Sequence, residues 1–598
     1  MALYYVLSLL VVDFSLVHGL DFVLPCKEDG PFCTGPVLEK VQMSSIFNDS
    51  KQFVDMPLKQ NWTKSIEQEI VNAKNDVELK QKLDQYFYPA GTREWHNENV
   101  TSKYDLKLID RIKDKRYKKW AKFLCLEWKK LVRKINPDVK TNSQRYSMIY
   151  LREKLVVPGG RFREMYYWDT YWSIEGLLHC EMYETTKNIL QDLLQMVQLY
   201  GFVPNGGRKY YENRSQPPFL TLMVLKYYEA TKDASFVIRN YKTLLKEHDF
   251  WMRERVVKVT KNGTIYTLNR YFSKLGYPRP ESFKEDKELV EEHYSDPKER
   301  QQVYSHIASA AESGWDFSSR WFNNSISMST IRTANIIPVD LNSILCAVEL
   351  ALSYLIKEVV LDPLMALSLH KNAMNRYTAI NEVLWNEEKG IWSDYFIQEK
   401  KLNSHFYASD IFPLWIEHFD SELQKNSRRD EVHTALERLN VMSYKGGFPT
   451  SKINSGQQWD FPNGWAPLQH ITVHSLDNNA SNSQLKESGR KIAQNFLENS
   501  YLAWEKTGHM FEKYNVESKG KAGHGGEYAI QTGFGWTNGV ILDFLHKYGD
   551  VLESPESISS DSYTISPILI KGPLSVGRLP FVLFGVSYLF IVYFFVWQ

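Results

Sequence analysis

The sequence predicts an all-α protein built from paired helices, with functional loops at the helix ends. Three observations favour this fold class. Apolar residues recur at helical spacing over long segments, whereas strand signals are few and short. The loops between the helical segments are marked by Gly and Pro and carry aromatic and carboxylate side chains. A chain of 598 residues is also long enough to bury a large core.

Three segments carry the clearest helical periodicity. Residues 236–252 place Val237, Ile238, Tyr241, Leu244, Leu245 and Met252 on one face. Asp340 is expected to cap a second helix, whose apolar stripe runs from Leu341 to Leu355. A third begins near Pro363, a favoured first-turn residue, carries Leu367 and Leu384, and is expected to stop at Gly390. Further helices are expected at 117–132, 484–502 and 536–546.

The segment 311–321 places Asp316 between Trp315 and Phe317. A carboxyl group between aromatic rings loses hydration, which disfavours its ionised form and raises its pKa. A carboxylic acid that keeps its proton near neutral pH can act as a general acid, and the two rings can stack on a sugar face. The alternative is a buried aspartate that ties loop backbone together.

The Trp-Asp pair occurs twice more, at Trp168-Asp169 and at Trp459-Asp460, each time in a loop marked by Gly or Pro. Similar settings in distant segments indicate one pocket lined by several loops. Sugars are bound in such pockets, by stacking and by hydrogen bonds to neighbouring hydroxyls. Coincidence in a chain rich in Trp and Tyr is the alternative.

Charge and motif content exclude several functions. The net charge is +1, which predicts no nucleic-acid partner. Glycine-rich phosphate loops of the Walker or Rossmann spacing do not occur. We also find no His or Cys spacing typical of a metal site, and the five cysteines are dispersed. An aromatic content of 14% suits carbohydrate binding.

Both ends of the chain are apolar. Residues 1–19 are interpreted as a secretory signal peptide, although no basic residue opens it and Asp13 interrupts it. Residues 579–598 form an uncharged apolar tail behind the Ser-rich polar linker 551–578. This order is typical of a GPI-attachment signal, and a single membrane span is the alternative. Either interpretation predicts attachment through the C-terminus at the outer face of the plasma membrane.

Sequons and cysteines agree with export. Asparagines in the N-glycosylation pattern are Asn48, Asn61, Asn99, Asn262, Asn323 and Asn479, with a further match at Asn213. Cys26 and Cys33 bracket a short loop and are expected to pair in an oxidising compartment. Cys125, Cys180 and Cys346 lie in apolar helical stretches and are expected to be buried thiols.

Six motifs, in order along the chain, resemble those of the trehalase family of glycoside hydrolases. The two longest are Pro-Gly-Gly-Arg-Phe-Arg-Glu-Met-Tyr-Tyr-Trp-Asp at 158–169 and Gln-Trp-Asp-Phe-Pro-Asn-Gly-Trp-Ala-Pro at 458–467. The others are Arg-Ser-Gln-Pro-Pro at 214–218, Arg-Pro-Glu at 279–281, the Asp316 segment, and Glu-Lys-Tyr at 512–514 with Gly-Gly-Glu-Tyr at 525–528. In its two ends the chain is similar to secreted or membrane-anchored animal members.

The resemblance implies an (α/α)6 toroid and an inverting hydrolysis of α,α-trehalose to two glucoses, with no metal or organic cofactor. It places Asp316 on the general acid and Glu512 on the general base. The positions that match the family's substrate-binding residues are Arg161, Trp168, Asp169, Asn205, Arg214, Ser215, Gln216, Arg279, Pro280, Glu281, Gly314 and Glu527. A glycan at Asn213, inside a binding motif, would block the site, so we expect that sequon to stay unmodified.

The expected organisation places a helical and loop region at 20–142, packed on a catalytic domain at 143–550. The three arginines at binding positions have an alternative role as ion-pair partners of Asp169, Glu281 or Glu527. Two alternative functions remain at this point. The first alternative is another α-glucosidase or a phosphorylase on the same toroid. The second is a surface sugar-binding protein without turnover.

Overall fold

The computed structural model describes residues 22–26, 30–96, 106–477 and 483–556. The described residues through Pro555 belong to one compact unit. The predicted signal peptide, most of the polar linker, the apolar tail and the sequons at Asn99 and Asn479 lie outside the described residues. Among the described residues, no helix combines the length and the apolar character needed to cross a bilayer. The predicted boundary between 142 and 143 stays a prediction.

Six helices of the described chain contact one another in a closed ring. In ring order they are α8 (Asp169–His179), α10 (Leu220–Thr231), α14 (Val339–Leu355), α16 (Phe412–Ile416), α18 (Ala466–Asp477) and α20 (Gly535–Tyr548), which returns to α8. These inner helices are buried on nearly all sides: α14, for example, is apolar around most of its circumference. A helix that is hydrophobic all round belongs in the interior, and this explains the inner position.

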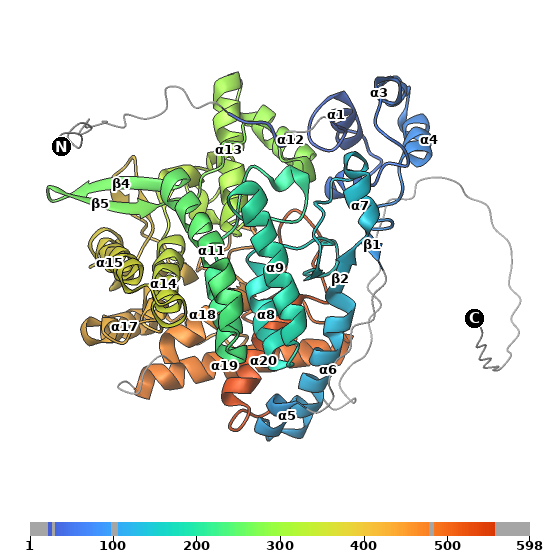
Figure 1. The fold of residues 1–598 in the computed structure, drawn as a ribbon. Helices are drawn as coiled ribbons and strands as arrows, with labels where there is room; N and C mark the ends of the chain where they lie inside the picture. Colours follow the sequence, from blue (N-terminus) through green and yellow to red (C-terminus); the bar gives the residue numbers. More distant parts are fainter. Residues whose placement is uncertain (1–21, 27–29, 97–105, 478–482, 557–598) are drawn as a thin grey trace, which may run out of the picture. The chain divides into compact units, whose positions relative to one another are not determined.

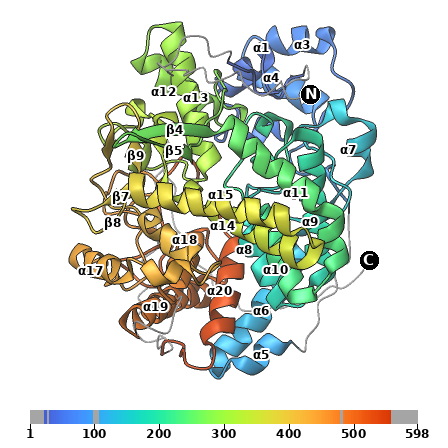
Figure 2. The ribbon, with the colours of Figure 1, turned by 60° about the vertical axis from the view of Figure 1, so that its left-hand side comes forward.

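Six more described helices alternate with the inner ones along the chain. They are α6 (Lys115–Leu131), α9 (Tyr183–Tyr200), α11 (Ala234–Glu254), α15 (Pro363–Ala379), α17 (Arg429–Leu439) and α19 (Ser483–Thr507). Figure 1 shows α9 and α11 side by side, and Figure 2 shows α15 lying over α14. These helices bury one face and expose the other, as an outer layer requires. The predicted all-α toroid of paired helices is therefore confirmed.

The inner helices point their N-termini toward one end of the ring. The loop before α10 carries Arg214, the loop before α18 carries Trp459, and the loop before α20 carries Glu512, while Asp169 opens α8. All four line one cavity. The sequence therefore places its motifs directly before the inner helices, and the fold gathers them at one end.

Several helix details differ from the sequence-based predictions. Ile238, expected on the buried face of α11, is 50% exposed, and Leu367 on α15 is 66% exposed. Phe250 and Trp251 fill the buried face of α11 instead. Asp340 does not cap α14, which begins after Pro338; its carboxylate accepts hydrogen bonds from Arg320. The third helix also ends early, because α15 gives way to a π-helical turn at Ile380–Leu384.

The strands of the described chain are short. The longest pair is the hairpin β4 (Val256–Lys261) and β5 (Thr264–Asn269), which the sequence analysis missed. The remaining strands are β1 (Trp95–His96), β2 (Val132–Ile135), β3 (Lys154–Val156), β6 (Ile336–Ile337), β7 (Trp385–Asn386), β8 (Ile391–Trp392), β9 (Tyr395–Phe396), β10 (Lys401–Leu402), β11 (Asn463–Trp465) and β12 (Lys513–Asn515). Antiparallel pairing of β11 with β12 joins the Trp459 loop to the Glu512 loop.

Smaller helices surround the ring. Before α6 come α1 (Pro36–Gln42), α2 (Lys51–Val54), α3 (Lys64–Val71), α4 (Asp76–Tyr86) and α5 (Lys107–Arg111), and after it α7 (Pro137–Thr141), α12 (Phe283–His293) and α13 (Pro297–Ser313). The segment with α1 to α4 has its own apolar cluster, centred on Phe53 and Phe87. It also reaches the loops of the ring, because Gln42 donates a hydrogen bond to the Pro280 carbonyl.

Four of the five cysteines form disulfides. Cys26 pairs with Cys33, as predicted. Cys125 pairs with Cys180, so the prediction that both are buried thiols is wrong. Cys125 lies on α6 and Cys180 directly follows α8, and because these helices pack together their Cα atoms lie 5.7 Å apart. Cys346 is a buried free thiol, as predicted.

Candidate active site

A cavity of about 650 Å³ lies at the loop end of the inner ring. Twelve of the fourteen sequence-predicted site residues line it: Arg161, Trp168, Asp169, Asn205, Arg214, Gln216, Arg279, Glu281, Gly314, Asp316, Glu512 and Glu527. They come from segments that span more than half of the chain.

Ser215 and Pro280 do not line the cavity. The Ser215 hydroxyl donates to the Val203 carbonyl at 2.7 Å, and its backbone N–H donates to Glu312 at 2.9 Å. The Pro280 carbonyl accepts the hydrogen bond from Gln42. These contacts hold the neighbouring residues of the two motifs in place, so Ser215 and Pro280 support the wall of the cavity from behind.

Gly314 lies in the wall of the cavity for a steric reason. It ends α13 with a φ of 76°, in the left-handed region that favours glycine. A Cβ atom on this residue would lie 2.6 Å from the ring of Trp168. Only glycine therefore lets the segment before Asp316 pack against Trp168.

Asp316 lies half-buried at the cavity, next to two fully buried rings. Burial raises the pKa of Asp316 to about 6, even though Arg279 and Arg214 favour its ionised form. Trp315 packs on Trp459, and Phe317 lies under the guanidinium of Arg279. Neither ring lines the cavity, so the idea that they stack on a sugar face is not supported. They remove water from around the carboxyl group instead.

Glu512 stands in a different environment. Its carboxylate accepts a hydrogen bond from the Tyr528 hydroxyl at 2.7 Å and lies 3.4 Å from the Lys513 ammonium group. Lys513 is fully buried and donates to Gln458 at 2.8 Å. A phenol hydroxyl and an ammonium group therefore face the Glu512 carboxylate. Asp169, on the same cavity, has its pKa raised well above the usual range by burial.

Arg161 pairs with a residue that the sequence analysis did not single out. Its guanidinium donates two hydrogen bonds to Asp49, at 2.8 and 2.6 Å. It also lies over the ring of Tyr528, 4.6 Å from the ring centre. The partners considered from the sequence were Asp169, Glu281 and Glu527. Asp49 comes from the segment before α2, so this N-terminal part of the chain reaches the cavity wall.

Arg214 and Glu281 form a buried ion pair with free hydrogen-bonding capacity. Arg214 donates to Glu281 at 2.5 Å and to Asn205 at 2.8 Å. Within the part of the chain that the structure describes, Arg214 Nη1 and Glu281 Oε2 are buried without a hydrogen-bond partner. Buried polar atoms are normally satisfied, and both residues line the cavity. The arrangement leaves one donor and one acceptor for a bound molecule.

Arg279 bridges two carboxylates. It donates to both oxygens of Asp286, at 2.9 and 2.7 Å, and lies 3.3 Å from Glu527. The expected pairing with Glu527 is therefore present, but Asp286 is the closer partner. The planar guanidinium fixes the orientation of Glu527 at the mouth of the cavity, where its side chain is 22% exposed.

An aromatic wall that was only partly predicted completes the cavity. Trp459 and Trp465 stack with their ring centres 3.8 Å apart, and Trp168 and Trp536 pack around them. All four rings line the cavity, and so does Tyr528. The recurrence of Trp-Asp identified Trp168 and Trp459. Trp465 lies six residues after Trp459 and Trp536 lies nine residues after Glu527, and their clustering depends on the ring closing.

Asp460, the third aspartate of the Trp-Asp pairs, has a structural role. It is fully buried and accepts hydrogen bonds from Ser318, Ser319 and Ser451. These bonds tie the loop after Asp316 to the loop that carries Trp459. The prediction of one pocket built by several loops is confirmed for Asp169, Asp316 and Trp459, while Asp460 is the buried aspartate that holds loop backbone together.

Comparison with known proteins agrees with the motifs. Residues 45–549 match the family model described as Trehalase. The chain is 41% identical to the trehalase of Homo sapiens over 541 residues, covering 89% of this chain and 91% of that protein. It is 38% identical to the trehalase of Apis mellifera, covering 94% and 91%. The structure of neutral trehalase from Saccharomyces cerevisiae shares its fold, with a TM-score of 0.53, 23% identity, and coverage of 67% of this chain and 75% of that one.

Proposed function

Because this chain belongs to the trehalase family, we propose that it hydrolyses α,α-trehalose to two glucose molecules. The observation that carries the proposal is the pair of carboxyl groups, Asp316 and Glu512, on one cavity in opposite electrostatic environments. Two carboxyl groups whose surroundings separate their protonation states are suited to act as acid and base.

Asp316 is the proposed general acid. The glycosidic oxygen of trehalose bridges two anomeric carbons, and the bond from one of these carbons to the oxygen breaks as Asp316 protonates that oxygen. A carboxyl group with a pKa of about 6 still holds its proton on a substantial fraction of molecules near neutral pH. Its half-buried position at the cavity lets it reach that oxygen while the rings behind it exclude water.

Glu512 is the proposed general base. As an ionised carboxylate it takes a proton from a water molecule, which attacks the anomeric carbon from the face opposite Asp316. The Tyr528 hydroxyl and the Lys513 ammonium group hold this carboxylate in place at the cavity. In inverting glycosidases the two carboxyl groups lie roughly 6.5–9.5 Å apart, which leaves room for the water.

The remaining cavity residues are proposed to hold the two sugar rings. The free donor of Arg214 and the free acceptor of Glu281 suit neighbouring hydroxyls. Trp459 and Trp465 present broad apolar surface on the cavity. The further substrate-binding positions are Arg161, Trp168, Asp169, Asn205, Gln216, Arg279, Gly314 and Glu527, with Ser215 and Pro280 acting through the backbone around them.

The decisive experiment is incubation of the purified chain with trehalose, maltose and sucrose, with and without inorganic phosphate. We expect glucose from trehalose at the same rate in either buffer. Phosphate-dependent release of glucose 1-phosphate would replace the hydrolase by a phosphorylase. Tight binding of trehalose without any glucose would identify a sugar-binding protein instead.

Stereochemistry tests the inverting course. Inversion at one anomeric carbon gives one β-glucose and one α-glucose from each trehalose, because the departing glucose keeps its configuration. Proton NMR within the first turnovers, before mutarotation, should show both anomers in equal amounts. Formation of α-glucose alone would show retention and remove Glu512 from the role of general base.

We also propose that the enzyme acts outside the cell, held at the plasma membrane through its C-terminus and carrying N-linked glycans. Asn48, Asn61, Asn262 and Asn323 are exposed, as glycan acceptors must be. The Asn213 amide donates to the Pro25 and Tyr210 carbonyls, which supports the prediction that this sequon stays unmodified. Peptide mapping after deglycosylation would identify the modified asparagines.

A further inference from the structure

A cluster of histidines surrounds one aspartate among the inner helices, and none of these residues lines the cavity. Asp543 lies near the C-terminus of α20, His470 and His474 lie on α18, and His179 is the last residue of α8. Asp169 opens α8 at the cavity end. At 1.5 Å per residue, His179 lies about 15 Å further along this helix. The cluster is therefore separate from the proposed active site.

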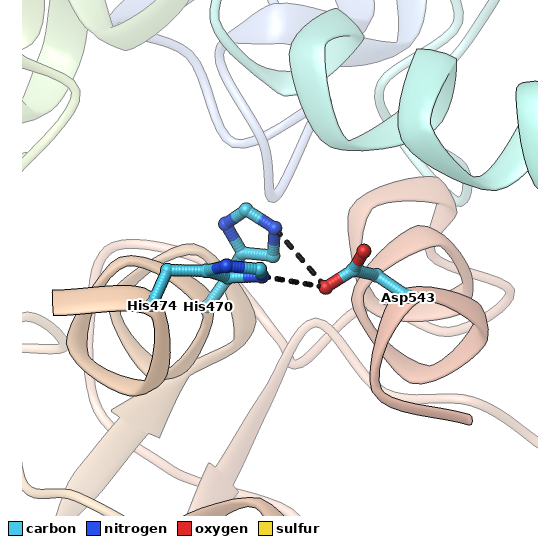
Figure 3. Close-up of side chains that lie close together, drawn as sticks. All are labelled: His470, His474 and Asp543. Atoms are coloured by element: carbon cyan, nitrogen blue, oxygen red, sulfur yellow. Dashed lines mark hydrogen bonds and ion pairs between the residues drawn. The ribbon is translucent and has the colours of Figure 1, made fainter. Parts of the chain in front are cut away.

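The ligand atoms of three of these residues lie within 4.8 Å of one another. Figure 3 shows the rings of His470 and His474, from one helix, approaching the same carboxylate oxygen of Asp543 from the neighbouring helix. His474 Nε2 lies 2.8 Å from this oxygen, and His470 Nε2 lies 3.4 Å from it. Tetrahedral zinc with bonds of about 2.0–2.1 Å separates its ligand atoms by about 3.4 Å.

His470 provides an independent indication of a ligand. Its side chain is 2% exposed, and neither ring nitrogen forms a hydrogen bond within the described residues. A buried polar group without a partner is unfavourable, because it has lost its hydrogen bonds to water. A metal ion between His470 Nε2 and Asp543 would satisfy this nitrogen.

Neighbouring residues orient the Asp543 carboxylate. His179 Nε2 lies 3.2 Å from the other oxygen of Asp543 and orients the carboxylate, as outer-shell groups do in metal sites. Glu175, the other carboxylate nearby, is already paired with Lys226 at 3.0 Å.

We propose that His470, His474 and Asp543 form a structural site for a divalent zinc-like metal ion that links α18 to α20. Two imidazoles and one carboxylate suit Zn²⁺, and His474, which is 15% exposed, leaves access for a water molecule as fourth ligand. The sequence analysis did not single out this pair of histidines. His470 and His474 are four residues apart on one helix and so lie on the same face.

The metal links two neighbouring helices of the inner ring. Inner helices α18 and α20 contact each other, and a shared ion would join His470 and His474 on α18 to Asp543 on α20. Because none of the three proposed ligands lines the cavity, the metal stabilises the fold and takes no part in the hydrolysis. Removal of the ion should lower the melting temperature and leave the initial rate on trehalose nearly unchanged at low temperature.

The test uses the full chain without a histidine tag. The protein is stripped with a chelator and titrated with Zn²⁺ against a chromophoric competitor, and bound zinc is counted by mass spectrometry after gel filtration. We expect one tightly bound zinc per chain and a higher melting temperature in the zinc form. Co²⁺ in place of zinc should give the visible absorption of a four-coordinate nitrogen and oxygen site.

His470→Gln and His474→Gln are the informative variants. Loss of an outer-shell partner weakens metal affinity by about 10–100-fold, so loss of a ligand should cost at least as much. His370→Gln is the matched control, because His370 also lies 3.0 Å from an aspartate but on α15, outside the cluster. His470 makes no hydrogen bond, so His470→Gln is the variant expected to fold normally if His474→Gln does not.

Zinc that fails to bind to the stripped chain would overturn the proposal. The proposal would also be overturned if His470→Gln and His370→Gln had the same zinc affinity and the same stabilisation by zinc. In either case the cluster would be a hydrogen-bonded group around Asp543, with no metal-binding role.

Discussion

At the scale of single residues, the environment of Asp316 and Glu512 separates two groups with the same chemistry. Rings and buried walls deprive Asp316 of water, and its pKa rises to about 6. A phenol and an ammonium group face Glu512. The same division of two carboxyl groups into acid and base recurs in glycosidases generally. The two roles proposed here can therefore be tested separately.

Replacement of either carboxyl group by its amide should remove activity without unfolding the chain. Asp316→Asn keeps the shape but cannot donate a proton, and Glu512→Gln cannot accept one. Each change should lower kcat by about 10²–10⁴-fold, the usual contribution of acid or base catalysis. Asp249→Asn, at an exposed position on α11, is the control. Near-normal turnover in either active-site variant would refute the assignment.

The pH profile should report the raised pKa of Asp316. A general acid works only while protonated, so kcat/KM should fall as the pH rises through about 6. This descending limb belongs to the free enzyme. Initial rates at low trehalose between pH 4 and 9 would measure it. A profile that stays flat from pH 5 to 8, or the same descending limb in the residual activity of Asp316→Asn, would contradict the prediction.

Tyr528→Phe should impair the proposed base while leaving the cavity intact. The change removes one hydrogen bond to Glu512, and hydrogen bonds to charged groups are worth about 1.5–3 kcal/mol, so kcat should fall by about 10–100-fold. An increase in KM of about 10–100-fold with unchanged kcat would instead indicate a role in substrate binding alone.

The sequence predicted the residues that line the site better than the residues that hold them in place. Motifs carry Asp316, Glu512 and the arginines as local patterns, so they were recognisable. Asp49 could not be found, because its partner Arg161 lies 112 residues away and nothing local marks the pair. Asp460 shares the Trp-Asp pattern, but its carboxylate is buried and accepts hydrogen bonds from five hydroxyl and amide groups. Tertiary packing brings these donors together, so the local sequence does not reveal them.

At the scale of helices and loops, Arg320 connects the Asp316 loop to the inner ring. Its guanidinium is fully buried and donates to Asp340, in the first turn of α14, and to Asp394 after β8. It lies between the rings of Trp315 and Trp321, 4.6 and 4.4 Å from their centres. Asp340 looked like a helix cap from the sequence, because aspartate at a helix start usually is one.

Arg320→Met should therefore destabilise the whole fold. It leaves two buried carboxylates without their partner, and breaking a buried ion pair in this way costs about 3–5 kcal/mol. Urea unfolding followed by fluorescence would measure the loss. Arg253→Met is the control, because its pair with Asp249 is exposed and should be worth at most about 1 kcal/mol. Equal stability of the two variants would show that Arg320 does not hold the loop to the ring.

At the scale of the whole molecule, the spacing of the apolar residues predicted the correct fold class, because inner and outer helices carry different apolar patterns. Inner helices are apolar all round and outer helices on one side only. Ring closure could not be read from periodicity, since the contact of α20 with α8 joins segments more than 350 residues apart. For the same reason the disulfide between Cys125 and Cys180 was missed, although both cysteines were placed on helices.

The disulfides and the exposed sequons together favour an oxidising compartment. Cys26–Cys33 and Cys125–Cys180 are both formed, and disulfides persist chiefly in secreted and cell-surface proteins. The hairpin tip carries the exposed sequon at Asn262. These observations concern the compact unit, and they agree with the signal peptide predicted at 1–19.

The remaining prediction concerns how the protein is held outside the cell. An uncharged apolar run at 579–598 behind a Ser-rich segment at 551–578 is the order expected of a GPI signal, whose small residues accept the lipid. The nearby basic residues, Lys571 and Arg578, lie on the side of the run that a span would leave outside the cell, contrary to the usual preference of basic residues for the cytoplasm. Treatment of intact expressing cells with a phosphatidylinositol-specific phospholipase should therefore release trehalase activity into the medium, while an unrelated enzyme with a transmembrane span stays on the cells. Activity that remains with the membrane, together with a tryptic peptide from beyond Arg578, would show that the apolar run is retained as a span.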